Sequence, residues 1–357
     1  MKLFLSAKMI GLMASLWLLP VGFARAAADI RPGDVWLDTS NCPIQAHGGG
    51  ILLQDHTYYW YGEEHTPGSS SVVACYSSTN LSAWKREGMA LSHFDLPRVE
   101  GQRGFVERPK VIYNPHTRKF VMWMHLEQDG YRYSRAGVAI SDQAGGHFKF
   151  LQALRPVANT NAFAAGDDAD QELYGGTVRD LNLFVDDDGR AYVIYSSEGN
   201  WTLYIVRLND DFTGPALPLV ENQTWARVLV RKMREGAALF KCDHRYYLIT
   251  SACTGWTPNA ADCAVADHIL GPYVSLGNPC VGNQSEQTFG GQSTFVLPVP
   301  EHPRTFVFMA DEWRPQNQAD SRYLWLPFTV ATNGTFKITW RDQWNPGKWA
   351  EFSEGTN

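Results

Sequence analysis

His56-Thr-Tyr-Tyr-Trp-Tyr61 is the first of five short runs that are rich in aromatic and β-branched residues. The other four, in chain order, are Arg118-Lys-Phe-Val-Met-Trp-Met124, Arg190-Ala-Tyr-Val-Ile-Tyr-Ser196, Arg245-Tyr-Tyr-Leu-Ile-Thr250 and Arg304-Thr-Phe-Val-Phe-Met309. The runs begin about 55 to 72 residues apart. Because such residues favour strands, the chain repeats one strand-forming unit five times.

A turn and another short apolar segment precede each run, which gives each repeat the pattern of a β-hairpin. Asn114-Pro-His-Thr117 and Asp186-Asp-Asp-Gly189 are two of these turns. Hairpins that recur every ~60 residues are typical of four-stranded propeller blades. We therefore predict an all-β fold, a five-bladed β-propeller. A β-sandwich is the structural alternative, but it does not explain the repeat.

The N-terminal residues follow the order of a secretory signal, with two lysines, an apolar run over residues 9–23 and a small-residue segment at 24–26. The apolar run is shorter than the ~20 residues that span a bilayer, which argues against a membrane anchor. We expect residues 1–27 to be a cleaved signal peptide. Residues 28–357 should form one propeller domain, since no Pro/Ser/Gly-rich linker divides them. The protein is then secreted or periplasmic, and we expect a monomer.

The charge balance argues against two classes of partner. Loss of the signal would lower the number of Lys and Arg residues from 31 to 28, against 37 Asp and Glu residues, and no run of basic residues remains. A surface of this charge is unsuited to nucleic acid or to an anionic membrane.

All six cysteines lie in the part that would be exported, where disulfides can form. An even number permits up to three disulfides, but the sequence does not choose among the pairings, and buried thiols are the alternative. No cysteine has the spacing of a zinc ligand, so a structural zinc site is not expected.

One polar residue stands at the same place in every repeat, about eleven to fourteen residues before the first aromatic residue of the run. In chain order these residues are His47, Glu107, Asp180, Glu235 and Gln292. The innermost strand of a blade should begin here, and innermost strands line the axis of a propeller. Each residue alone could be a solvated strand edge, but the shared register favours a ring at one mouth of the channel.

Three carboxyl groups in one ring raise one another's pKa, so that one of them can stay protonated near neutral pH. Glycosidic bond cleavage requires such an acid for the leaving oxygen and a group across the sugar that activates water. The 13 Trp residues add surfaces that can stack on sugar rings, although a single Trp is more often a core residue. The candidates are Trp60, Trp123, Trp201, Trp256, Trp313 and Trp325.

The motifs around these positions resemble those of glycoside hydrolase family 43, and in particular its exo-β-1,3-galactanases, over nearly the whole chain after the signal. They are Gln45-Ala-His-Gly-Gly-Gly50, Tyr59-Trp-Tyr-Gly-Glu63, Glu107-Arg-Pro-Lys-Val-Ile-Tyr-Asn114, Thr250-Ser-Ala-Cys-Thr-Gly-Trp-Thr-Pro-Asn259, Gly291-Gln-Ser293 and Tyr323-Leu-Trp-Leu-Pro327. The resemblance implies an inverting hydrolase that releases galactose from the non-reducing end of β-1,3-galactan, such as the backbone of arabinogalactan.

The resemblance also implies a role for each ring carboxylate. Glu235 is expected to be the general acid, Asp180 to hold its pKa and orientation, and Glu107 to bind hydroxyl groups of the terminal galactose. Further contacts of the galactose pocket are expected at Glu63, Tyr131, Asn200 and Thr254, with Tyr133 as the alternative to Tyr131.

The first repeat departs from the wider family, most members of which carry an Asp general base where this chain has His47. The exo-galactanases also lack that Asp, and the resemblance assigns the base to Gln292. An amide is a very poor base, so physical chemistry alone favours His47, whose ordinary pKa of about 6.5 suits proton abstraction. Gln292 is our first candidate and His47 our second, and each could instead only position its neighbours.

The missing Asp also separates the expected function from its alternatives. An α-L-arabinofuranosidase or a β-xylosidase on this scaffold would need that Asp. A catalytically silent sugar-binding propeller would follow if neither Gln292 nor His47 activates water. Some family members hold calcium in the axial channel, but this chain has no Asp/Asn/Gly loop with calcium spacing. We therefore expect no metal and no cofactor.

Overall fold

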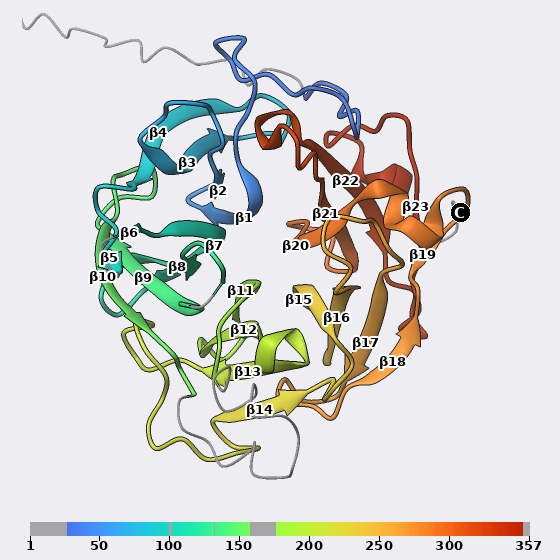
Figure 1. The fold of residues 1–357 in the computed structure, drawn as a ribbon. Coiled ribbons are helices and arrows are strands. Elements are labelled where there is room, and N and C mark those ends of the chain that lie inside the picture. Colours follow the sequence, from blue (N-terminus) through green and yellow to red (C-terminus); the bar gives the residue numbers. More distant parts are fainter. Residues whose placement is uncertain (1–26, 100–101, 132, 158–175, 353–357) are drawn as a thin grey trace, which may run out of the picture.

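Five antiparallel sheets stand around a common axis in the computed structural model, which describes residues 27–99, 102–131, 133–157 and 176–352 (Figure 1). Four of these sheets have four strands and the last has three. This arrangement confirms the predicted all-β, five-bladed propeller. Residues 1–26, nearly all of the expected signal peptide, lie outside the described residues. In the described part of the chain, no helix is both long and apolar enough to cross a membrane.

Each blade runs from an innermost strand at the axis to an outer strand at the rim. Blade one contains β1 (His47–Gln54), β2 (Thr57–Glu63), β3 (Ser71–Ser78) and β4 (Lys85–Ser92). Blade two contains β7 (Phe105–Asn114), β8 (Lys119–Glu127), β9 (Arg135–Ser141) and β10 (Lys149–Leu154). Blade three contains β11 (Leu181–Val185), β12 (Ala191–Ser197), β13 (Thr202–Arg207) and β14 (Trp225–Val228).

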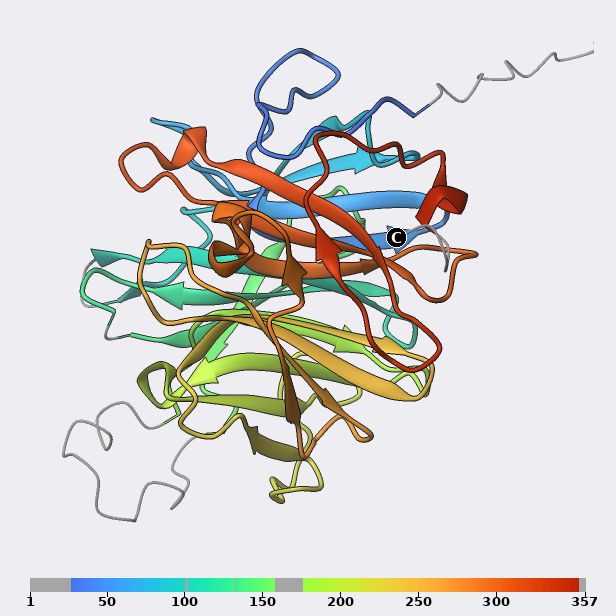
Figure 2. The ribbon, with the colours of Figure 1, turned by 90° about the vertical axis from the view of Figure 1, so that its right-hand side faces the viewer.

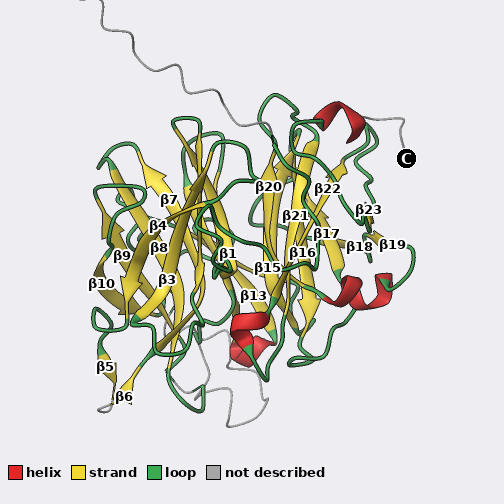
Figure 3. Ribbon diagram, turned by 90° about the horizontal axis from the view of Figure 1, so that it is seen from above, coloured by secondary structure: helices red, strands yellow, loops and turns green. Residues whose placement is uncertain are grey.

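Blade four contains β15 (Arg234–Cys242), β16 (Arg245–Ala252), β17 (Asp262–Ala266) and β18 (Val274–Gly277), and blade five contains β20 (Gln292–Pro298), β21 (Thr305–Glu312) and β22 (Arg322–Thr329). Two small sheets lie outside the blades. One is the pair β5 (Arg98–Val99) and β6 (Gln102–Arg103), and the other is the parallel pair β19 (Cys280–Val281) and β23 (Ile338–Thr339). Figure 3 shows that the helices are a few short turns between strands.

The five innermost strands β1, β7, β11, β15 and β20 contact one another in sequence and close a ring. The second strand of each blade is covered on both faces, because a blade packs between two neighbours. Every residue of β12 is buried, and so is every residue of β8 after its first. This double cover explains why the five runs are nearly continuous in apolar residues instead of alternating.

The two ends of the described chain meet where blade five joins blade one (Figures 1 and 2). The backbone N of Ile30 donates to the carbonyl oxygen of Trp344 at 2.8 Å, and the N of Trp344 donates back at 3.0 Å. Beside this bridge the ring of Trp36 packs on Trp60 and Trp325, with centroid distances of 6.2 and 5.0 Å. Aromatic packing therefore closes the propeller.

Three of the proposed sugar-stacking residues belong to the core. The exposed fractions of Trp60, Trp123 and Trp325 are 1%, 0% and 0%, so the suggestion that they stack on sugars is wrong. They lie on second or third strands, where neighbouring blades cover them. Trp201 and Trp256 are 40% and 50% exposed, because short loops carry them at the ends of strands.

The structure contains no disulfide between the six cysteines, all of which lie within the described residues. Cys75, Cys242, Cys263 and Cys280 are buried. Of the two alternatives left open by the sequence, the structure therefore has buried thiols, which pack as small apolar groups.

The closure by aromatic residues predicts a large effect of Trp60→Ala on stability. The ring contacts Trp84 and Trp325 at centroid distances of 5.3 and 4.7 Å, so its loss leaves a cavity between the first and last blades. We expect the free energy of unfolding to fall by about 3–5 kcal/mol, measured by denaturant unfolding. The half-exposed Trp201→Ala should cost less than about 1 kcal/mol, and equal losses would contradict this account.

Candidate active site

A β-bulge at the start of the innermost strand turns the ring residue of several blades towards the axis. Strand pairing shifts register directly after His47, Glu107 and Glu235. The residues that follow them have left-handed backbone, namely Gly48, Arg108 and Gly236 with φ of 57°, 54° and 59°. Bulges of this kind re-aim side chains, and an arginine in this conformation is uncommon.

Four of the five ring residues meet in a cavity of about 600 Å³ at one mouth of the channel. Glu107, Asp180, Glu235 and Gln292 line it, and each comes from a different blade. Side chains of blade one, including Glu63, complete the wall. The repeat has therefore brought residues that are 185 positions apart in the sequence, Glu107 and Gln292, to one site.

Glu235 is held between two amide groups. Nδ2 of Asn200 donates to Oε2 at 3.1 Å, and Nε2 of Gln292 donates to Oε1 at 3.0 Å. Burial, and then the negative charge of Asp180, raise the pKa of Glu235 to about 7, although Arg108 opposes the shift. A carboxyl group with this pKa is protonated in a large fraction of molecules at neutral pH.

Arg108 lies behind the acid and balances its charged neighbours. Its guanidinium is 3.1 Å from Oδ2 of Asp180, and it donates to the carbonyl oxygen of Ser293 at 3.1 Å and to the amide oxygen of Gln292. Burial would lower the pKa of Arg108, but the surrounding carboxylates, Asp180 foremost, raise it. The backbone N of Gly236 donates to Oδ2 of Asp180 at 3.0 Å and fixes that carboxyl group.

The amide of Gln292 is fully engaged. Its oxygen accepts hydrogen bonds from Arg108 and from Nε1 of Trp313, the latter at 2.9 Å. Its nitrogen donates to Glu235 and to Oγ of Ser251, the latter at 3.1 Å. These four contacts fix which end of the amide faces the acid.

His47 does not reach the cavity. Its side chain is fully buried, its Nδ1 lies 3.3 Å from Oδ1 of Asp311, and its Nε2 lies 3.4 Å from the hydroxyl group of Tyr323. The ring stacks on Tyr323 at a centroid distance of 4.8 Å. This position gives our second candidate for the base no contact with the space where a sugar would lie.

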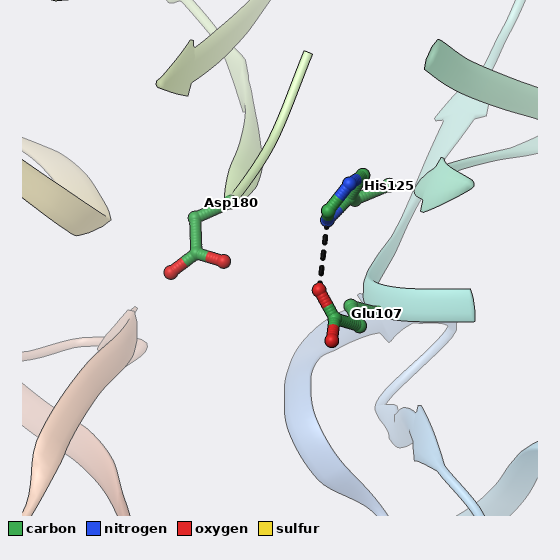
Figure 4. A group of neighbouring side chains, drawn as sticks. All are labelled: Glu107, His125 and Asp180. Atoms are coloured by element: carbon green, nitrogen blue, oxygen red, sulfur yellow. Dashed lines mark ion pairs between the residues drawn. The ribbon is translucent and has the colours of Figure 1, made fainter. Parts of the chain in front are cut away.

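Glu107 forms an ion pair at the cavity wall. Its Oε2 lies 2.9 Å from Nδ1 of His125, and its Oε1 accepts a hydrogen bond of 2.6 Å from the hydroxyl group of Tyr131. Figure 4 shows His125 pointing at Glu107, with Asp180 facing them from blade three. Burial opposes ionisation of Glu107, but the contact with His125 and the bond from Tyr131 outweigh it and lower its pKa.

Among the described residues, Glu107, His125 and Asp180 bring their polar atoms within 4.8 Å of one another, as metal ligands do. The chemistry of His125 does not suit a metal. Its two nitrogens face the carboxylates of Glu107 and Glu127, which overcome burial and raise its pKa to about 9. His125 lies between two carboxylates, at 2.9 and 3.2 Å, and Asp180 lies against Arg108, so each charge of the group already has a partner and the three residues fit an ion-pair network better than a bound cation.

Three of the four expected pocket contacts line the cavity, namely Glu63, Asn200 and Tyr131. Tyr133, the alternative to Tyr131, does not line it and packs in the core of blade two. Thr254 also stays outside, because its hydroxyl group donates to the carbonyl oxygen of Thr257 at 2.6 Å within its own loop. That turn presents Trp256, which does line the cavity.

Sequence reasoning missed Arg108 and His125, whereas Trp313, one of the proposed sugar-stacking residues, lines the cavity. A signal for His125 was present, because a second polar position recurs at the end of the second strand. Its members pair with the ring residues in four of the blades, as Glu63 with His47, His125 with Glu107, Ser251 with Glu235 and Asp311 with Gln292. The inward position of Arg108 depends on the bulge, which no local sequence pattern predicts.

A comparison with protein families agrees with this geometry. The sequence profile of the glycosyl hydrolases family 43 matches residues 49–336, which is most of the chain. The chain belongs to glycosyl hydrolase family 43. Membership makes it a glycoside hydrolase and accounts for the carboxyl cluster at the mouth of the channel.

Solved structures of family 43 share the fold. A β-1,3-galactosidase with galactodeoxynojirimycin is 41% identical, with a TM-score of 0.78 over 88% of this chain and 100% of its own. An exo-β-1,3-galactanase from Clostridium thermocellum is 34% identical (TM-score 0.76; 88% of this chain, 66% of its own). One from Phanerochaete chrysosporium with galactose is 29% identical (TM-score 0.74; 89% and 68%). No curated protein matches the chain.

The charge balance predicts that Asp180→Asn lowers the pKa of Glu235. The variant removes the negative charge that raises this pKa and leaves the opposing charge of Arg108 without its ion-pair partner. The carboxyl signal of Glu235, assigned by its loss in Glu235→Gln, should titrate at a lower pH in a ¹³C NMR titration. The fraction protonated at neutral pH should therefore fall. An unchanged midpoint would show that Asp180 does not set this pKa.

Proposed function

We propose that this family 43 hydrolase releases galactose from the non-reducing end of β-1,3-galactan, the backbone of arabinogalactan, with inversion of configuration. One observation carries the proposal. Glu235, whose pKa is raised to about 7, lies beside the ion pair of Asp180 with Arg108. Structures with this fold that are named β-1,3-galactosidases and exo-β-1,3-galactanases support the choice of sugar and linkage.

Glu235 is the general acid in this proposal. Its proton passes to the glycosidic oxygen as the bond to the anomeric carbon breaks. Asn200 orients the carboxyl group through its bond to Oε2, while burial and Asp180 keep the proton in place at neutral pH. Asp180 therefore acts through the acid and does not itself transfer a proton.

Gln292 is our candidate for handling the attacking water. Its amide is oriented by Arg108, Trp313 and Ser251, and it lies in contact with the acid. A direct bond of 3.0 Å between Gln292 and Glu235 leaves no room for a sugar between them, so substrate entry must replace it. In this proposal Gln292 holds the water and, in the imidic acid form of its amide, takes up the proton that the water loses as its oxygen bonds to the anomeric carbon. His47, which stacks on His65 and on Tyr323, then acts as a support for the wall of blade one.

The opposite wall of the cavity binds the terminal galactose in this proposal. The Glu107 carboxylate, with its lowered pKa, accepts hydrogen bonds from sugar hydroxyl groups, and Tyr131 and Glu63 border the same space. Trp256 and Trp313 lie on the side of blades four and five, with ring centroids 5.8 Å apart. They offer apolar faces to sugar rings, which Trp60, Trp123 and Trp325 do not.

Export through the N-terminal signal is part of the proposal, because polymeric galactan is met outside the cytoplasm. The acidic surface and the monomeric state stay predictions, as does the lack of nucleic-acid partners.

Glu235→Gln should reduce the release of galactose from β-1,3-galactotriose by at least about 10³-fold, because the amide cannot donate the proton that the leaving oxygen needs. Binding of galactose, measured by calorimetry, should persist, since the substitution keeps the size of the side chain. Wild-type protein should give α-galactose first in a proton NMR time course. Activity of the variant close to that of the wild type would exclude Glu235 as the acid.

The choice of substrate is tested with β-1,3-galactotriose, β-1,6-galactobiose, arabinan and xylan oligosaccharides side by side. We expect release from the β-1,3 substrate alone. Release of arabinose or xylose would make the chain an α-L-arabinofuranosidase or a β-xylosidase. Measurable binding with no product would make it a silent sugar-binding propeller.

Turnover should not need a metal ion in our proposal, because Glu107 and Asp180 already face the side chains of His125 and Arg108, at 2.9 and 3.1 Å. Dialysis against EDTA should leave the rate of galactose release within about twofold of the untreated rate. A loss that added calcium restores would contradict this, and would place the ion near Glu107 and Asp180.

A further inference from the structure

Glu127, at the end of β8, is a buried carboxylate that touches no part of the cavity. Its side chain is completely shielded from solvent. Its oxygens accept hydrogen bonds from the backbone N of Gln128 at 3.0 Å, of Tyr133 at 2.8 Å and of Ser134 at 3.0 Å. Oγ of Ser134 donates a further bond of 2.6 Å. Three backbone N–H groups and one hydroxyl group therefore donate to this single carboxylate.

The donors belong to the loop that carries Tyr131. Backbone N–H groups on both sides of this tyrosine converge on one carboxylate, which closes the loop around a fixed anion. Tyr131 and Ser134 have left-handed backbone, with φ of 53° and 40°, and neither is glycine. Strained conformations of this kind persist only where surrounding contacts over-determine them. Glu127 supplies those contacts.

Glu127 is also linked to the cavity wall through His125. Its Oε2 lies 3.2 Å from Nε2 of His125, whose other nitrogen faces Glu107. Hydrogen bonding outweighs the cost of burial and lowers the pKa of Glu127 to about 2, so it is an anion throughout the neutral range. Glu127, His125 and Glu107 therefore form a row of a buried anion, a buried cation and an anion that lines the cavity.

We propose that Glu127 is a positioning residue for the sugar pocket, which holds Tyr131 through the loop and Glu107 through His125. Tyr131 and Glu107, the two residues that Glu127 holds, meet at the cavity. There the hydroxyl group of Tyr131 donates to Glu107 at 2.6 Å. We call this set of contacts the relay. The inference rests on the proposed function, in which Glu107 binds the terminal sugar. Glu127 acts on binding of that sugar and not on the proton transfer at Glu235.

The charge of His125 depends on every ionisable group that faces it. These are Glu107 from β7, Glu127 from its own strand, Tyr131 from the loop and Asp180 from blade three, while Arg155 lies near Glu127. Removal of one of the two contacting carboxylates lowers the pKa of His125. Above that lower pKa the neutral imidazole no longer balances Glu107, so sugar binding weakens as the pH rises.

Glu127→Gln is the decisive variant, because it keeps the shape of the side chain and removes its charge. We expect KM for β-1,3-galactotriose to rise by about tenfold or more at pH 8, with kcat within about threefold. The rise should be smaller at pH 5.5, where His125 stays protonated. The inhibition constant of galactose should change in parallel, since the relay acts on the terminal sugar.

Asp186→Asn is the matched control. Asp186 is a partly buried carboxylate, bonded to Lys241 and to Tyr246, but it lies at the turn after β11 and away from the cavity. It should lose stability without a change in KM. An equal rise of KM in this control, or a pH-independent KM in Glu127→Gln, would overturn the inference.

Two further measurements separate the proposed role of Glu127 from misfolding of the variant and from failure of the proposed function. Ser134→Ala removes one bond to Glu127 and should raise KM in the same direction by a smaller factor, even if Glu127→Gln does not fold. Wild-type protein is assayed in parallel, because a wild type that releases no galactose defeats the proposed function. An active wild type with an unaltered Glu127→Gln variant defeats only the present inference.

Discussion

A single buried guanidinium, that of Arg108, holds the active site together. It contacts Asp180, the amide oxygen of Gln292 and the carbonyl of Ser293, and its own backbone N donates to Oε1 of Glu63 at 2.8 Å. These partners come from blades one, three and five, so the cation links sheets that the chain connects only through long loops. A buried cation needs such partners, and Asp180 is the carboxylate in direct contact with it.

The partners of the neighbouring carboxyl groups explain why these groups differ in pKa. Asp180 lies against Arg108, and Glu107 lies against the protonated His125, so both have a positive partner in contact. Glu235 has two amides as its nearest partners, and amides do not favour ionisation as strongly as cations do. Burial and the charge of Asp180 then dominate at Glu235 and raise its pKa. The pKa values of Glu235 and Glu107 are thus moved apart by their surroundings, since both carboxyl groups start from the same intrinsic pKa.

The sequence predicted the fold and four residues of the cavity because both depend on one period. Five runs of strand-forming residues require five blades, and a polar residue in fixed register with them must reach the axis. The prediction was wrong where burial decides: Trp60 lies on a strand that a neighbouring blade covers, whereas Trp256 lies on an exposed loop. The prediction did not include Arg108, because alternation along a strand would turn the residue after Glu107 away from the axis. The left-handed bulge reverses that direction and depends on tertiary contacts.

The contact between Gln292 and Glu235 bears on the order of events in the proposed reaction. A sugar can enter only if this bond of 3.0 Å is exchanged, whereas the bond from Asn200 to the other oxygen of Glu235 need not change. Asn200 can therefore keep the acid aimed while Gln292 is released towards water, still held by Arg108 and Trp313 through its oxygen. The amide of Gln292 then serves first to keep the acid in place and later to place the nucleophile. This double use gives a physical reason for an amide at a position where a carboxylate would repel Glu235 and Asp180.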